Sequence, residues 1–106
     1  MEKAEAAMKG KFRSTLKRLA TSGKHHRYLH AALIAKGSQV FGAGVNTDGH
    51  HAEVNAIVRA GKNCKGSTLY TLMLRRSDHS LGNGAPCEIC MEAISQAKLK
   101  RVIVYV

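Results

Sequence analysis

Two short segments of this sequence carry side chains that could hold a metal ion. One is the His-Ala-Glu run at residues 51–53, and the other is the Pro-Cys-Glu-Ile-Cys run at residues 86–90. Cys87 and Cys90 are three residues apart, so on a helix both thiols face the same way. Imidazole and thiolate groups are good zinc ligands, and three protein ligands leave a fourth position open for water. His51, Cys87 and Cys90 are therefore candidate ligands of a catalytic zinc ion.

Glu53 follows the candidate histidine by two residues and would lie beside the metal without needing to bind it. A carboxylate in that place can take a proton from water on the zinc and return it to a leaving amine. Zinc lowers the pKa of that water to about 7, so hydroxide is available at neutral pH. Hydroxide, a proton shuttle and an open position make a hydrolytic site, and Glu53 is its candidate catalytic residue.

The cysteine pair has two other interpretations. A thioredoxin-like redox site needs Cys87 and Cys90, but it has no need of the His-x-Glu segment upstream. A closed structural zinc site needs a fourth ligand, which His50, His79 or Cys64 could supply.

The elements that would bring the two segments together alternate along the chain. Four apolar or β-branched runs predict strands at residues 28–35, 39–45, 68–74 and 101–106. Helices are expected at 51–60 and 87–98, each after a strand. Parallel strands with crossover helices put successive helix N-termini at the same sheet edge, which would join the segments. The order predicts an α/β fold, a mixed sheet of a hairpin followed by parallel strands with helices on both faces. His30, on the first strand, is expected to be a hydrogen-bonded packing residue.

Residues 1–22 are expected to form a basic amphipathic helix, because apolar residues recur at helical spacing between residues 3 and 21 and Lys and Arg fill the other face. The chain has 17 Lys and Arg against 7 Asp and Glu, a formal net charge of +10. This excess favours polyanionic partners or phosphorylated substrates. The helix is either a solvated face or a contact surface for nucleic acid.

Length and composition restrict the class of protein. The 106 residues, 44% hydrophobic and 23% charged, suit one globular domain at 1–106 and exclude wholesale disorder or a fibrous repeat. No apolar run reaches the ~20 residues of a membrane span, and the N-terminus lacks a hydrophobic signal core. An odd number of cysteines, three, argues against a disulfide framework. We therefore expect a cytoplasmic protein.

Together, the two segments resemble the signature of the zinc-dependent cytidine and deoxycytidylate deaminase superfamily, His-x-Glu followed by Pro-Cys-x-x-Cys. The longer run at residues 51–57 looks like the deoxycytidylate branch, and the resemblance covers residues 28–106, which would be the catalytic core. It implies a three-layer cytidine deaminase-like fold, here truncated after the fourth strand. It also implies zinc ligation by His51, Cys87 and Cys90.

The resemblance further implies roles around the metal. Glu53 would be the proton shuttle, and Asn46, at the end of the second hairpin strand, would contact the sugar of the substrate. The backbone beside Ala52 and the position of Ala85 would help to hold the base. Arg75 begins the loop after the third strand and could bind a substrate phosphate through bidentate hydrogen bonds.

The expected function is hydrolytic deamination of the cytosine of a nucleoside or nucleotide, of the dCMP or CMP type, with release of ammonia. One alternative is a deaminase of cytosine or adenine in single-stranded DNA, RNA or tRNA. The absence of Trp and the 5% aromatic content count against it, because strand-binding channels stack bases on rings. The other is a zinc-stabilised nucleic-acid-binding module without turnover, which would not need Glu53. Exposed sheet edges invite pairing, and members of the family are commonly oligomers, so a homo-oligomer is expected.

Overall fold

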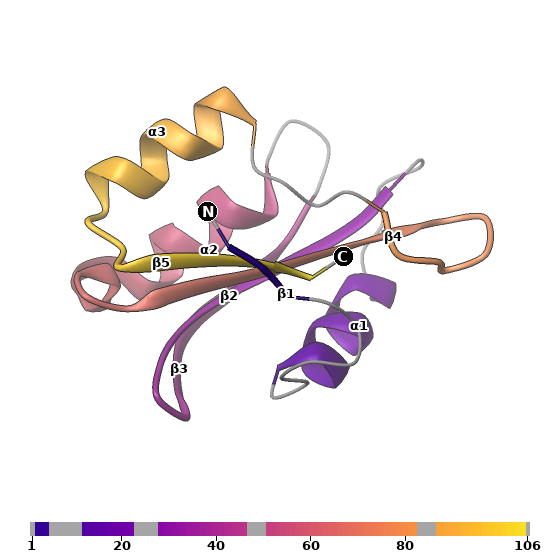
Figure 1. The fold of residues 1–106 in the computed structure, drawn as a ribbon, viewed down its shortest axis with the longest axis horizontal. Coiled ribbons are helices and arrows are strands. Elements are labelled where there is room, and N and C mark those ends of the chain that lie inside the picture. The colour runs from indigo at the N-terminus through magenta and orange to yellow at the C-terminus, as the bar shows by residue number, and fades with distance from the viewer. Residues whose placement is uncertain (1, 5–11, 23–27, 47–50, 83–86, 106) are drawn as a thin grey trace.

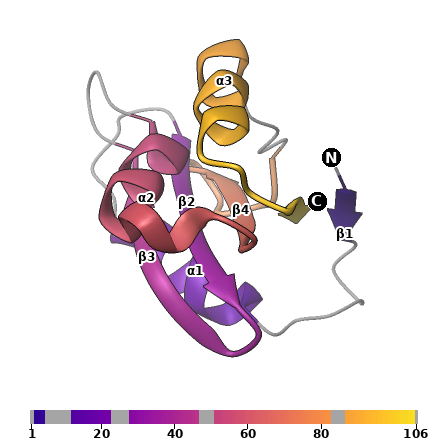
Figure 2. The same cartoon turned by 90° about the vertical axis from the view of Figure 1, so that its left-hand side faces the viewer.

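A five-stranded sheet forms the middle layer of the molecule, with helices on both of its faces (Figures 1 and 2). The computed structural model describes residues 2–4, 12–22, 28–46, 51–82 and 87–105. The elements in chain order are β1 (Glu2–Ala4), α1 (Arg13–Thr21), β2 (Tyr28–Lys36), β3 (Gln39–Val45), α2 (Ala52–Ala60), the 3-10 turn η1 (Gly61–Cys64), β4 (Thr68–Arg75), α3 (Glu88–Gln96) and β5 (Arg101–Tyr105).

The strand order across the sheet is β1-β5-β4-β2-β3. The interior strand β2 is antiparallel to both neighbours, so that Ala32 pairs with Gly44 of β3 and with Thr71 of β4. Strand β5 is parallel to β4 and to β1. The predicted mixed sheet, in which a hairpin is followed by parallel strands, is confirmed.

Side chains of β2 alternate between two apolar cores. Leu33 and Ala35 pack on the α1 side of the sheet, whereas Ala32 and Ile34 pack on the α2 side. All four are buried, as expected for an interior strand that is covered on both faces. The three-layer prediction is therefore correct, with α1 on one face and with α2 and α3 on the other (Figure 1).

Helix α2 lies very close to the hairpin strand β3. A Cβ atom on Gly42 would lie 2.6 Å from the backbone nitrogen of Ala60, and one on Gly44 would lie 2.7 Å from Cβ of Asn55. Only glycine permits so close an approach at these positions. Asn55 Nδ2 then donates a hydrogen bond of 2.9 Å to the backbone oxygen of Val45, which ties the first turns of α2 to the end of β3.

The N-terminal prediction was wrong in part. Residues 2–4 form strand β1 beside β5, where a helix was expected, and α1 begins only at Arg13. The outer edge of β5 offers unpaired backbone groups, and pairing with them outweighs the helical periodicity of this segment. The sheet thus has one strand more than the four expected, and residues 5–11 lie outside the described part.

None of the helices within the described ranges is long and apolar enough to cross a membrane.

Candidate metal centre

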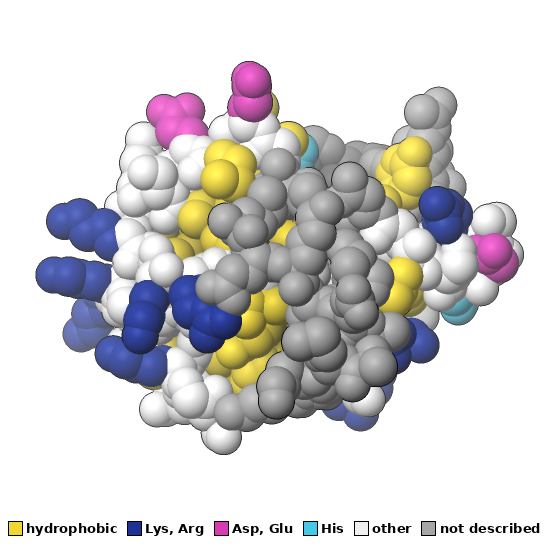
Figure 3. Space-filling model, viewed as in Figure 1, with side chains coloured by type: hydrophobic (Ala, Val, Ile, Leu, Met, Phe, Trp, Pro, Cys, Tyr) yellow, Lys and Arg dark blue, Asp and Glu magenta, His cyan; other side chains and the backbone are white. Residues whose placement is uncertain are grey.

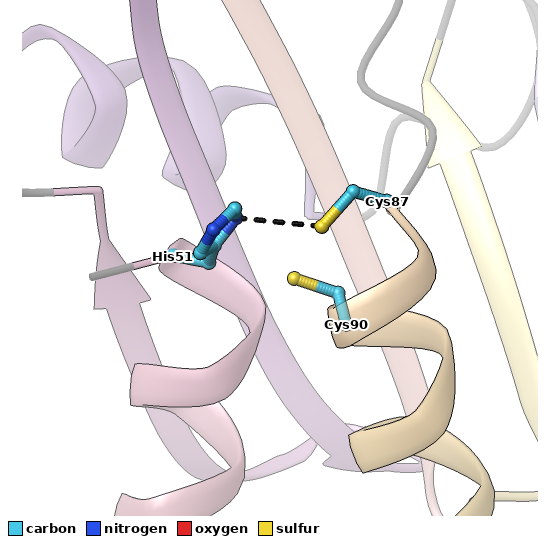
Figure 4. A group of neighbouring side chains, drawn as sticks. All are labelled: His51, Cys87 and Cys90. Atoms are coloured by element: carbon cyan, nitrogen blue, oxygen red, sulfur yellow. Dashed lines mark hydrogen bonds between the residues drawn. The ribbon is translucent and has the colours of Figure 1, made fainter. Parts of the chain in front are cut away.

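The N-terminal ends of α2 and α3 bring the three candidate ligands together (Figure 4). His51 is the N-cap residue of α2 and Cys87 is that of α3, both with extended backbone. Cys90 lies in the first turn of α3, so its thiol faces the same space as that of Cys87. The two sequence segments therefore form one cluster, as the helix positions predicted.

The donor atoms of this cluster fit a zinc ion. One ligand atom from each of His51, Cys87 and Cys90 lies within 4.8 Å of the other two. The Cys87 Sγ to His51 Nδ1 distance is 3.7 Å. Zinc bonds of about 2.0–2.3 Å at tetrahedral angles separate neighbouring ligand atoms by roughly 3.5–3.8 Å. His51 and Cys87 are exposed while Cys90 is buried, so the cluster is open to solvent on one side.

Cys90 lies in surroundings that do not favour an isolated thiolate. Burial is the main cause that raises the pKa of the Cys90 thiol to about 12, and the charge of Glu53 is the second. A thiolate at this place therefore requires a nearby cation, as in a metal site.

Glu53 is a buried carboxylate in the first turn of α2, with only 1% of its surface exposed. Its Oε1 has no hydrogen-bond partner in the described part of the chain. Burial raises the pKa of the Glu53 carboxyl, against the smaller effect of a hydrogen bond from its own backbone N–H. The fold thus holds a buried carboxylate, with one oxygen that lacks a hydrogen-bond partner among the described residues, beside the cluster of His51, Cys87 and Cys90.

His30 on β2 is a titratable neighbour of that carboxylate. Its ring Nδ1 lies 3.7 Å from Oε1 of Glu53, and its Nε2 lies 2.6 Å from Oγ1 of Thr71. Burial, and then the charge of His51, lowers the pKa of His30 to about 4. The expectation of a hydrogen-bonded packing residue is confirmed. Its closeness to Glu53 was missed, because strand register and helix placement are not readable from the spacing in the sequence.

Asn46 ends the β2–β3 hairpin with its side chain already engaged. Its Oδ1 accepts a hydrogen bond of 2.8 Å from the His30 backbone N–H, and its Nδ2 donates one of 3.2 Å to the backbone oxygen of Tyr28. The Asn46 side chain thus extends the pairing of β2 with β3 by one residue. One N–H and part of the oxygen's capacity remain for another partner.

The other predicted substrate contacts are only partly placed. Ala52 is buried between His51 and Glu53. Arg75 ends β4, and its Nη1 donates to Ser80 Oγ and to the Leu81 backbone oxygen, both at 3.1 Å. These contacts hold Arg75 within its own loop.

Of the possible fourth ligands, neither of those described joins the cluster. Cys64 is buried in the core beyond the far end of α2, and His79 is exposed in the loop after β4. His50 and Ala85 lie outside the described residues, as does Pro86. The described part of the chain therefore supplies three candidate ligands.

The chain matches the family described as "Cytidine and deoxycytidylate deaminase zinc-binding region" over residues 1–106. No curated protein matches it in sequence.

Solved structures share the fold. RibD of Acinetobacter baumannii (form 2) is 26% identical with a TM-score of 0.61, and the match covers 85% of this chain and 25% of that one. Guanine deaminase of Bacillus subtilis is 25% identical with a TM-score of 0.66, over 88% of this chain and 60% of that one. The dCMP deaminase of cyanophage S-TIM5 in apo form is 21% identical with a TM-score of 0.64, over 93% and 87%. This chain thus spans only a quarter of the length of RibD.

Proposed function

Because the chain belongs to the cytidine and deoxycytidylate deaminase family, we propose that it is a zinc-dependent hydrolytic deaminase acting on the cytosine of a nucleoside or nucleotide, of the dCMP or CMP type. One observation carries the proposal: a buried, under-bonded carboxylate, Glu53, lies beside a cluster of one histidine and two cysteines. A structural zinc site would have no use for that carboxylate.

Each residue of the site has a role in this reaction. His51, Cys87 and Cys90 would hold zinc, which when bound supplies Lewis-acid activation of water. Glu53 takes one proton of the attacking water and delivers it to ring N3, and it then passes the second proton, from the new C4 hydroxyl, to the amine at C4. The C4–N bond breaks, ammonia leaves, and uracil remains, so that one water is consumed for each ammonia released. Burial of Glu53 keeps bulk water from competing for that proton.

Substrate contacts are part of the same proposal. Asn46 would use its remaining N–H for the sugar, and the backbone beside Ala52 and Ala85 would hold the base. Arg75 would offer a phosphate its guanidinium nitrogens other than Nη1, which is held in the loop. The cyanophage deaminase has also been solved in complex with dCMP and dUMP, at 20% identity and a TM-score of 0.57 over 93% of this chain and 85% of that one. That likeness supports a pyrimidine nucleotide as the first substrate to test.

We further propose that residues 1–106 act as one deaminase domain, in the cytoplasm and as a homo-oligomer. The three cysteines are free thiols, which suits a reducing compartment. Val58 on α2 and Ile89 on α3 are 73% and 68% exposed, and contact with a second copy would remove them from water.

A substrate panel tests the function. Ammonia release should be measured with zinc-loaded protein on dCMP, CMP, cytidine, guanine, and cytosine in single-stranded DNA. We expect the highest kcat/KM with dCMP or CMP. Preference for the DNA would favour the nucleic-acid deaminase instead, and no release from any substrate would contradict a deaminase of this kind.

A further inference from the structure

The ring of His30 lies between Thr71, on the neighbouring strand β4, and Glu53 of α2. Its Nδ1 is 3.7 Å from Oε1 of the glutamate, and its Nε2 is 2.6 Å from Oγ1 of Thr71. Thr71 is fully buried on β4, and its Oγ1 also lies 3.3 Å from the backbone oxygen of Ala31. A packing role explains the contact with the threonine but not the one with the carboxylate.

The role that His30 can play towards Glu53 depends on which ring nitrogen carries its proton. A neutral imidazole has one N–H donor and one acceptor nitrogen. The contact between Nε2 and Thr71 Oγ1 is compatible with donation in either direction, whereas the longer contact with the Ala31 oxygen has the hydroxyl as donor. Donation by the hydroxyl to Nε2 would leave the ring proton on Nδ1, facing the Glu53 oxygen that has no hydrogen-bond partner in the described part of the chain.

We propose that His30 is a positioning residue for Glu53. Its Nδ1–H holds Oε1, so that the second carboxylate oxygen stays directed at the attacking water and the leaving amine, and Thr71 fixes the required tautomer. This inference rests on the proposed deaminase function. Hydrogen bonds in such sites are often long in the absence of substrate and shorten in the complex. His30 itself would touch neither zinc nor substrate.

Two substitutions at His30 separate positioning from packing. In His30→Asn the side-chain amide nitrogen can take the place of Nδ1, and the contact with Thr71 is lost. In His30→Gln the amide reaches the place of Nε2, and the donor facing Glu53 is lost. The measurements are kcat and KM for the best substrate of the parent, zinc content, and the melting temperature.

The proposal expects kcat of His30→Gln to fall about 10–100-fold, the usual loss when a supporting hydrogen bond is removed. KM and zinc content should stay within about threefold of the parent, and His30→Asn should recover most of kcat. If His30 only packs, His30→Gln should have the higher melting temperature of the two variants, because it keeps the contact with Thr71. Both folded variants should then have the kcat of the parent. Either parental kcat in His30→Gln or equal losses in both variants would overturn the proposal.

Thr71→Val provides a second test if neither His30 variant folds. It keeps the shape of the side chain and removes the hydroxyl that fixes the ring, so kcat should fall several-fold with KM unchanged. Thr68→Val, at the opposite end of β4, is the matched control and should behave as the parent. Unchanged kcat in Thr71→Val would then refute the positioning role. A parent without deaminase activity would instead refute the proposed function.

Discussion

At the scale of single residues, the site depends on a few side chains that helix ends and strand ends hold in place. His51 and Cys87 cap their helices, and Cys90 lies one turn further along. At Cys90 a backbone hydrogen bond at the helix start favours a thiolate, but burial outweighs it, so that a cation is needed to hold the thiolate form. The cluster thus needs little beyond correct placement of α2 and α3 to bind metal.

The first prediction concerns the zinc ligands. Cys90→Ser should lose most of the zinc, about one per chain in the parent, because a hydroxyl is a far poorer ligand and no fourth side chain of the described residues replaces it. Metal content after gel filtration measures this. Cys64→Ala, at a buried cysteine outside the cluster, is the control and should keep its zinc.

Asn46→Ala is expected to affect both stability and activity. The variant loses the hydrogen bonds to the His30 N–H and the Tyr28 oxygen, at a cost of about 1–3 kcal/mol in the free energy of unfolding. Urea titration measures that cost. If the amide also binds the sugar, kcat/KM of the folded, zinc-loaded variant should fall by a further factor of about 10–100. A loss of stability with parental kcat/KM would make Asn46 purely structural.

At the scale of elements, the close contact between α2 and β3 positions the metal cluster. A Cβ atom on Gly44 would lie 2.8 Å from the backbone oxygen of Ala52, the residue between His51 and Glu53. The first turn of α2 can occupy its place only because this strand position has no side chain. The absence of a side chain at Gly44 of β3 therefore allows the backbone at the start of α2, and with it His51, to lie where it does.

Gly44→Ala tests that link. The added methyl group must push the start of α2 away, so we expect a loss of stability of about 1–3 kcal/mol, as for other overpacked sites. Zinc affinity should fall too, because His51 moves with the helix. Ser38→Ala in the turn of the same hairpin should change neither, and zinc titration of both variants gives the comparison. Unaltered affinity in Gly44→Ala would mean that the helix start adapts without moving His51.

The helices and strands could be predicted well from the sequence where their signals are local. Alternation and turn residues predicted β2 to β5 within about a residue or two at most ends, and the spacing of Cys87 and Cys90 predicted their shared direction. Strand β1 was missed, because its pairing with β5 joins the two ends of the described chain. The approach of His30 to Glu53 was missed for a similar reason, since register and helix docking are tertiary properties.

At the scale of the whole molecule, one group of exposed positive charges lies at the end of the sheet away from the starts of α2 and α3 (Figure 3). Exposed lysines and arginines gather where α2 and α3 end and β4 and β5 begin: Lys36, Lys62, Lys65, Lys98, Lys100 and Arg101. Helix C-termini favour cations, which explains part of this placement. This group of charges therefore gives little reason by itself to expect a polyanion at the candidate metal centre.

We predict that copies of the chain associate in solution. Sedimentation at micromolar concentration should show a species larger than the 11.5 kDa monomer. Ile89→Asp should shift it towards monomer, because a charge replaces a side chain that is 68% exposed and that we propose to be buried between copies. Val40→Asp, at an exposed apolar position on β3, is the control. A parent that sediments only as monomer would contradict the homo-oligomer.

The central claim is that Glu53 transfers the proton in a hydrolytic deamination, and ammonia release by Glu53→Gln at matched zinc occupancy tests it most directly. Glutamine keeps the shape of the side chain but cannot shuttle a proton. General acid–base groups contribute about 10²–10⁴-fold, and this one serves both the attack of water and the departure of ammonia. We therefore predict intact zinc binding and fold with kcat reduced at least about 10⁴-fold. Deamination within tenfold of the parent would contradict the catalytic role of Glu53.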